Sequence, residues 1–243
     1  MHKTPAEAAA LAKEILAGAA AVPQDRELIL FPASVSAGAV ADICVGSRVS
    51  VGMQNMYWEA EGAFTGEVSP LMVKAVGCRY VLAGHSERRH IFGEDDAAVN
   101  KKALAALANG ISPILCVGEL LQERESGVSN EVIVRQLKQG LSGVAAEDMR
   151  RIIIAYEPVW AIGTGKVATP EIAEEIHSLV RQTLAEIFGG EIAEAVPVLY
   201  GGSVKPENIA GLVSMPNIDG ALVGGASLNA ASFLSIAKVS IGK

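Results

Sequence analysis

The chain has 243 residues, half of them apolar, and its 20 Lys and Arg against 27 Asp and Glu give a formal net charge of −7. High apolar content with few charges excludes a disordered protein, and the acidic balance leaves no basic surface for nucleic acid. No apolar run approaches the roughly 18 to 20 residues that cross a membrane. We therefore expect a cytoplasmic protein with neither a membrane nor a nucleic-acid partner.

The N-terminal segment predicts an amphipathic helix. Thr4 offers an N-cap hydroxyl, Pro5 suits the first helical position, and Glu7 completes a capping box. Lys13 and Glu14 interrupt the apolar stretch that a signal peptide would need.

Seven short apolar runs follow, and they are continuous rather than alternating, which is typical of strands covered on both faces. These runs span residues 28–31, 49–54, 80–83, 113–117, 152–156, 198–200 and 221–223. Helical segments lie between them. The longest begins with a Thr169 cap and Pro170 and extends to about Phe188, where Gly189 and Gly190 end it.

This alternation predicts a parallel sheet wrapped by helices, either open or closed into a barrel. At this length, with Gly-rich and polar residues after almost every strand, a single (β/α)8 barrel domain over residues 1–243 is favoured. Such a barrel needs eight strands, whereas seven are predicted and the chain begins in a helix. Either one strand is unrecognised or the first one is missing.

A histidine, His85, follows the strand predicted at 80–83, just before a helix start. Backbone N–H groups at such a position disfavour the cationic ring, so the imidazole can act as a neutral hydrogen-bond donor. The alternative is a packed structural histidine, with Glu87, Arg88 and Arg89 forming a solvated cluster of ion pairs.

A lone carboxylate, Glu157, comes directly after the strand predicted at 152–156. Partial desolvation at that position raises the basicity of a carboxylate, which suits a general base. The next loop is bracketed by Pro158 and several glycines and carries Val159 and Trp160, a composition that suits a lid excluding water. The alternative is an ordinary glutamate before a turn.

Two glycine pairs close the last two predicted strands, Gly201-Gly202 and Gly224-Gly225. Glycines there let backbone N–H groups approach an anion, and the loops after the last two strands of such barrels are a recurring phosphate site. Tight turns are the alternative.

Further residues are expected to play structural or surface roles. His90 and His177 lie among polar or helical surroundings and are expected at the surface. Apolar residues from Met53 to Phe64 crowd an otherwise polar loop at 54–70, as in an exposed partner-binding element.

The three cysteines, Cys44, Cys78 and Cys116, are an odd number and lie far apart, so we expect free thiols in a reducing compartment. Cys116 has no apparent cationic neighbour and is expected to be a packed thiol rather than a nucleophile.

Four segments together resemble the signature segments of the triosephosphate isomerase family, and the resemblance runs in the same order over the whole chain. They span residues 83–89, 155–166, 200–204 and 223–228. The resemblance implies a (β/α)8 TIM barrel that interconverts dihydroxyacetone phosphate and glyceraldehyde 3-phosphate, a small phosphorylated triose substrate, without a metal or an organic cofactor.

The resemblance also implies residue roles. Glu157 would be the base that moves a proton between two carbons, and neutral His85 would polarise the carbonyl and shuttle protons between the enediol oxygens. Residues 158–166 would form the lid. Phosphate contacts would come from Gly163, Ser203, Gly224 and Gly225. The supporting residues would be Ser86, Glu87, Cys116 and Glu119.

The loop at 54–70 is similar to the arm by which the family dimerises, so a homodimer is implied. The residues that carry this similarity are Gln54, Asn55, Tyr57, Trp58 and Thr65.

The start of the chain departs from the family pattern, in which a first strand leads into an Asn-x-Lys motif that reaches the substrate. Residues 1–5 match the part just after that lysine, and neither Lys3 nor Lys13 occupies its place. We therefore expect a barrel lacking its first strand, open at that point, and negligible isomerase activity for the chain as written.

Two alternatives to an active isomerase stay open. One is a catalytically dead barrel of the same family that binds phosphorylated ligands or a protein partner. The other is a different phosphate-binding barrel that acts on another sugar or an indole substrate.

Overall fold

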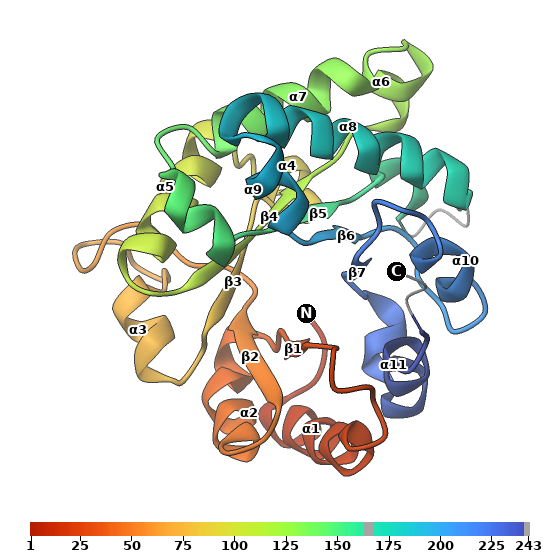
Figure 1. The fold of residues 1–243 in the computed structure, drawn as a ribbon. Coiled ribbons are helices and arrows are strands. Elements are labelled where there is room, and N and C mark those ends of the chain that lie inside the picture. Colours follow the sequence, from red (N-terminus) through yellow and green to blue (C-terminus); the bar gives the residue numbers. More distant parts are fainter. Residues whose placement is uncertain (163–167, 241–243) are drawn as a thin grey trace.

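A curled, all-parallel sheet forms the centre of the protein, with its seven strands in sequence order (Figure 1). The structure, a computed structural model, describes residues 1–162 and 168–240. The strands are β1 (Leu28–Leu30), β2 (Val49–Met53), β3 (Tyr80–Ala83), β4 (Ser112–Val117), β5 (Ile153–Tyr156), β6 (Val198–Tyr200) and β7 (Gly220–Ala221). All seven predicted strands are confirmed, with several ends shifted by one or two residues.

Helices cover the outside of this sheet (Figure 1). The α-helices are α1 (Pro5–Ala19), α2 (Ala37–Cys44), α3 (Pro70–Ala75), α4 (Ser86–His90), α5 (Asp96–Ala108), α6 (Leu121–Glu125), α7 (Ser129–Gly140), α8 (Pro170–Phe188), α9 (Gly190–Ala195), α10 (Ile209–Val213) and α11 (Ala230–Ala237). Short 3-10 helices are η1 (Ser34–Ser36), η2 (Ala146–Arg151), η3 (Val159–Ala161) and η4 (Gly225–Leu228). The order of strands and helices is that of a TIM barrel.

Both predicted helix starts are confirmed. The Thr4 backbone N–H donates to the Glu7 carboxylate at 2.8 Å, and the Thr169 hydroxyl accepts from Ile172 N–H at 3.3 Å. Helix α8 ends at Phe188, where Gly189 adopts a φ of 91° that favours glycine. The second glycine, expected to reinforce this stop, instead begins the short helix α9.

Side chains alternate along each strand between the inner face of the sheet and its helix-covered outer face. An inner cluster is formed by Leu82, Ile114, Cys116 and Ala155. The outward neighbours Leu115 and Ile154 join the large cluster packed against the helices. Both faces are therefore buried, which explains why the strands read as continuous apolar runs.

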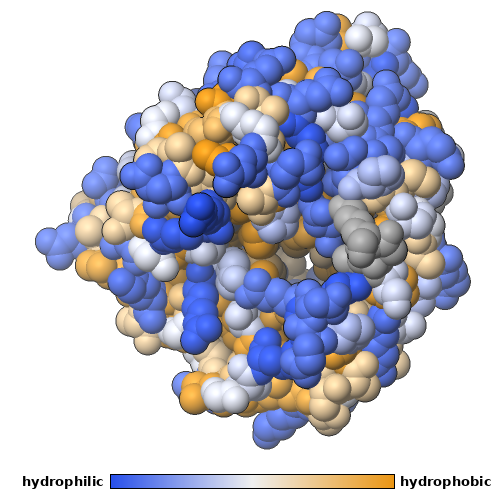
Figure 2. Space-filling view, in the orientation of Figure 1, coloured by the Kyte–Doolittle hydropathy of each residue, from blue (hydrophilic) through white to orange (hydrophobic). Residues whose placement is uncertain are grey.

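The sheet has two edges, β1 and β7. Within the part of the chain that the structure describes, β1 pairs with β2 and β7 with β6, and the two edge strands do not pair with each other. Ile29, Leu30 and Ala221 are accordingly only half-buried. The space-filling surface is hollowed near its centre, with hydrophobic residues visible inside the hollow (Figure 2).

The helix layer is more continuous than the sheet, because α1 packs against α11. Gly18 makes this approach possible: a Cβ atom there would lie 2.3 Å from Leu234 Cδ1. The expectation of seven strands with an open edge is therefore confirmed for the sheet, while the two ends of the chain meet through their helices.

None of the helices in the described ranges combines the length and the apolar character that a membrane span needs. The three cysteines are free, as expected, and all three are buried.

Hydrogen exchange tests the open sheet. Because edge strands have one unpaired side, we expect the backbone amides of Leu28–Leu30 and Gly220–Ala221 to exchange faster than those of Ser112–Val117 and Ile153–Tyr156. Residue-resolved NMR exchange at constant pH measures this. Equal protection of the edge strands and of β4 and β5 would contradict the open sheet.

Candidate active site

Strand alternation brings two of the predicted residues to the inner face of the sheet. Ile153 and Ala155 face inward from β5, so the next residue of that parity, Glu157, also faces inward. His85 follows β3 after Gly84, which turns the chain with a φ of 75°, and forms the N-cap of α4. The carboxyl ends of neighbouring parallel strands lie at the same edge of the sheet, which brings the two side chains together.

His85 and Glu157 are in direct contact, with Nε2 of the histidine 3.0 Å from Oε1 of the glutamate. The other ring nitrogen, Nδ1, accepts a hydrogen bond from the backbone N–H of Glu87 at 3.3 Å. Because Nδ1 is an acceptor, the ring proton lies on Nε2 and points at Glu157. A ring in this arrangement can donate a hydrogen bond from Nε2 toward Glu157.

Burial raises the pKa of Glu157, whose residue is only 2% exposed. The nearby His85 and two hydrogen bonds from Ser86 oppose this shift. Ser86 donates its backbone N–H to Oε2 at 2.9 Å and its hydroxyl to Oε1 at 3.3 Å. Glu157 is thus a desolvated carboxylate held in one orientation, which is the arrangement of a strong general base.

Cys116 lies beside this carboxylate near the end of β4, where its thiol is one of the groups that oppose the rise in the pKa of Glu157, and its Sγ lies 3.9 Å from Ile114 O. Its side chain is fully buried, and burial raises the pKa of the thiol well above its ordinary value. The expectation of a packed thiol rather than a nucleophile is confirmed, because a protonated, inaccessible thiol is a poor nucleophile.

Glu119 follows β4 by two residues and binds side chains that lie before and after Glu157 in the sequence. Its Oε1 accepts from the Tyr156 hydroxyl at 3.1 Å and from Trp160 Nε1 at 2.8 Å. Arg124 approaches the same oxygen at 3.6 Å. A fully buried carboxylate therefore joins β5 to η3.

The two glycine loops follow the adjacent strands β6 and β7. Gly201 lies against the base, since a Cβ atom there would be 2.9 Å from Glu157 Cγ. Ser203 is half-buried, and Gly224 and Gly225 are exposed with open space where a side chain would be. Gly163, the remaining predicted phosphate contact, and residues 163–166 of the predicted lid lie outside the described residues.

The charged residues after His85 do not form the solvated cluster that was the alternative. Glu87 is exposed and contributes its backbone N–H to His85. Arg89 is nearly buried and bridges three elements, donating to Gly84 O at 2.8 Å, Cys116 O at 3.2 Å and Asp96 Oδ1 at 2.6 Å. The sequence does not reveal this bridging role of Arg89, because two of its partners are backbone carbonyls, which every residue carries.

The 54–70 loop projects from one side of the molecule (Figure 1) and is more internally packed than predicted. The expectation of an exposed apolar stretch is wrong for Met53 and Met56, which are buried. Tyr57 stacks on Trp58 with ring centroids 3.9 Å apart, while Phe64 stays 39% exposed.

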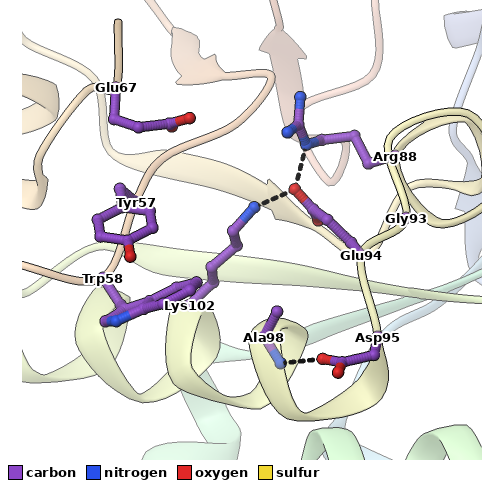
Figure 3. Close-up of a pocket in the computed structure, with 9 residues that line it drawn as sticks. All are labelled: Tyr57, Trp58, Glu67, Arg88, Gly93, Glu94, Asp95, Ala98 and Lys102. Atoms are coloured by element: carbon purple, nitrogen blue, oxygen red, sulfur yellow. Dashed lines mark hydrogen bonds and ion pairs between the residues drawn. The ribbon is translucent and has the colours of Figure 1, made fainter. Parts of the chain in front are cut away.

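A cavity of about 270 Å³ lies between this loop and the segment joining α4 to α5. Lys102 reaches across it, with Nζ 2.7 Å from Asn55 Oδ1, and also pairs with Glu94, which pairs in turn with Arg88 (Figure 3). The nine lining residues are Tyr57, Trp58, Glu67, Arg88, Gly93, Glu94, Asp95, Ala98 and Lys102. This network attaches the loop to α4, the helix capped by His85.

The surface prediction holds for His90 and is wrong for His177. His177 is fully buried on the inner side of α8, with Nδ1 3.1 Å from Asn217 O.

Lys3 and Lys13, which were expected to lie away from the site, are both exposed, Lys3 before α1 and Lys13 within it. Across residues 1–162 and 168–240, no three His, Cys, Asp or Glu side chains are grouped to hold a metal ion.

Comparison with known proteins decides the family, because a family model described as Triosephosphate isomerase matches residues 1–240. The chain belongs to the triosephosphate isomerase family. The triosephosphate isomerase of Chloroflexus aurantiacus is 52% identical over 236 residues, which cover 97% of this chain and 94% of the relative. That of Syntrophotalea carbinolica is 52% identical over 238 residues, 98% of this chain and 94% of the relative. That of Carboxydothermus hydrogenoformans is 50% identical over 241 residues, 99% and 96% respectively.

Proposed function

We propose that the chain is a triosephosphate isomerase in which Glu157 is the base and His85 the electrophile. The reaction interconverts dihydroxyacetone phosphate and D-glyceraldehyde 3-phosphate by proton transfer through an enediol. The single observation that carries this proposal is the buried carboxylate of Glu157, 3.0 Å from the protonated nitrogen of a neutral imidazole.

The base removes a proton from the carbon next to the substrate carbonyl. Burial makes the ionised carboxylate of Glu157 more basic than an exposed one, and Ser86 N–H anchors Oε2 and directs the carboxylate toward the inner face. The electron pair of the broken C–H bond forms the enediolate double bond. Glu157 then returns the proton to the neighbouring carbon, while His85 transfers the hydroxyl proton from one enediol oxygen to the other, so that the carbonyl and the hydroxyl exchange places.

The electrophile is His85, whose Nε2 proton is donated to a substrate oxygen that enters beside Glu157. Because Glu87 N–H occupies Nδ1, the ring presents its proton from Nε2. A donor held at the place where negative charge develops stabilises the transition state more than the bound substrate.

The phosphate group of the substrate would be bound by backbone N–H groups of Ser203, Gly224, Gly225 and Gly163. In support, the first three follow adjacent strands at the edge of the sheet that carries Glu157. Apart from the chain neighbours, no atom of the described residues lies within 4 Å of the place where a Cβ of Gly224 or Gly225 would be. The three free thiols fit a protein that works as a single barrel domain in the reducing cytoplasm.

We also propose a homodimer that forms through the 54–70 loop. Large apolar side chains are exposed on this loop, on the helix that follows it and at the end of α4. They are Phe64, Leu71, Met72, Ile91 and Phe92. Exposed apolar groups on adjoining segments favour association with another protein surface, and the loop is already attached to α4 through Lys102.

The substitution Glu157→Gln tests the role of the base. An amide cannot accept the proton, so we expect kcat to fall by at least about 100-fold. A coupled assay of glyceraldehyde 3-phosphate turnover measures it, with Glu157→Gln compared with its parent both in this chain and in the form extended at its N-terminus by the family's first strand and Asn-x-Lys motif. Circular dichroism confirms folding. Near-normal turnover of the variant would refute the role of Glu157. Equal absence of turnover in the unsubstituted chain and in a form extended at its N-terminus by the family's first strand and Asn-x-Lys motif would favour the catalytically dead barrel.

The pH dependence of kcat/KM provides a second test. Since burial raises the pKa of Glu157, the ionised base is lost as pH falls through a midpoint above the ordinary glutamate value of 4.5. We expect the acid limb of the profile at that higher pH. The substrate phosphate also ionises in this range, with a second pKa of about 6. Carbon-13 NMR titration of the Glu157 carboxylate in the free protein therefore distinguishes the ionisation of the base from that of the substrate. A carboxylate midpoint at or below 4.5 would contradict the proposed base.

The substitution Phe64→Glu tests the dimer. A charge placed in an apolar contact is costly, so we expect the dissociation constant to rise at least about tenfold in sedimentation velocity. Val45→Glu is the matched control, because Val45 is also apolar and 80% exposed but lies at the end of α2. An equal effect of both variants, or a monomeric unsubstituted chain, would refute dimerisation through this loop.

A further inference from the structure

A buried side-chain amide on α7 makes two hydrogen bonds to one backbone residue at the end of β4. Gly118 N–H donates to Gln136 Oε1 at 2.7 Å, and Gln136 Nε2 donates to Gly118 O at 3.1 Å. Gln136 is only 3% exposed. Its amide therefore satisfies both polar groups of Gly118, as a partner strand would.

The residues on either side of Gly118 are hydrogen-bonded to the segment that carries the base. Glu157 N–H donates to Val117 O at 2.8 Å, and Val159 N–H donates to Glu119 O at 3.2 Å. Gly118 is thus the centre of a three-residue segment that runs beside residues 157–159. Gln136 holds this segment from the opposite side.

The two segments are in direct contact at Gly118. A Cβ atom on this residue would lie 1.8 Å from Glu157 O and 3.4 Å from Glu157 Cα. No side chain larger than that of glycine fits there, so a displacement of Gly118 is passed directly to the backbone of Glu157. In a closely packed interior there is no free space between the two segments that could absorb the movement.

The chemistry of the contact requires an amide. Glutamine offers one acceptor and two donors, whereas an ionised glutamate has no donor for Gly118 O and a methionine has neither group. Docking of α7 does not need this amide, because Ile133 and Leu137 on the same helix are fully buried in the apolar cluster.

We infer that Gln136 is a positioning residue for Glu157, fixing the end of β4 against the backbone of the base through its double hydrogen bond to Gly118. The inference rests on the proposed role of Glu157 in proton transfer. Gln136 touches neither the carboxylate nor, in the proposed arrangement, the substrate, so it acts through the backbone alone.

The test is the near-isosteric variant Gln136→Met. Misplacement of a reacting group by about 1 Å can cost 100-fold, so we expect kcat to fall about 10- to 100-fold with KM within about twofold of the parent. Parent and variant are compared in the same N-terminally extended form that is used for Glu157→Gln. The phosphate end of the site is untouched, which keeps KM nearly constant. Gln136→Glu, which preserves size and one acceptor, is expected to lose kcat in the same way.

The matched control is Asn100→Leu. Asn100 on α5 is also a side-chain amide that binds backbone carbonyls, those of Gly140 at 3.0 Å and Ser142 at 2.8 Å, but it does not contact the 117–119 segment in the described hydrogen bonds. We expect its kcat within about twofold of normal. Equal loss of kcat in Gln136→Met and Asn100→Leu, or unchanged kcat in Gln136→Met, overturns the inference.

A readout independent of turnover is the carbon-13 resonance of the Glu157 carboxylate, assigned by its loss in Glu157→Gln. We expect Gln136→Met to shift it and to bring its titration midpoint closer to that of an exposed glutamate, with no change in Asn100→Leu. An unchanged resonance in Gln136→Met overturns the inference. If Glu157→Gln retains turnover, the proposed base itself fails. If Glu157→Gln loses turnover while Gln136→Met keeps the kcat of the parent, only the positioning role of Gln136 is refuted.

Discussion

An ionised carboxylate that is almost completely removed from water needs hydrogen-bond donors in fixed places, and this requirement organises the end of the sheet. Glu157 receives Ser86 N–H at one oxygen and faces the Nε2 proton of His85 at the other. Burial increases its basicity, while the donors keep the charged form accessible. Basicity and orientation thus come from the same position, directly after a strand covered on both faces.

The positions of these donors depend on contacts that join neighbouring strand ends. Arg89 joins the carbonyls of Gly84 and Cys116, and so ties the end of β3 to the end of β4. Glu119 joins Tyr156 to Trp160 on either side of the base. Each of these contacts is made inside the protein, where an unpaired polar group would cost about 1 to 3 kcal/mol, so they restrain one another.

The strands and the two residues of the proposed proton-transfer pair could be predicted because their signals are local. A buried parallel strand is a short apolar run, and a polar residue directly after such a run lies at the edge where the strand ends meet, as His85 and Glu157 do. The buried position of His177 also has a local signal in the sequence, since Ala173, Val180 and Leu184 share its face of α8 at helical spacing.

Other residues carry no such signal. Arg89 and Gln136 bind backbone atoms whose positions depend on the whole fold, and an arginine or a glutamine on a helix is most often exposed. The polar composition of its loop predicts that Met56 is exposed, whereas the loop folds back on itself and buries the Met56 side chain. Local sequence therefore identifies the groups that react better than the groups that hold them.

The order of the strands also bears on how the chain folds. Every pair in the sheet joins strands that are consecutive in the sequence, from β1 with β2 to β6 with β7. Loop-closure entropy for such neighbours is small, so each strand can add to the one before it without waiting for a distant segment. The contact between α1 and α11, which spans nearly the whole chain, then carries the largest loop-closure cost, so we expect it to form late in assembly.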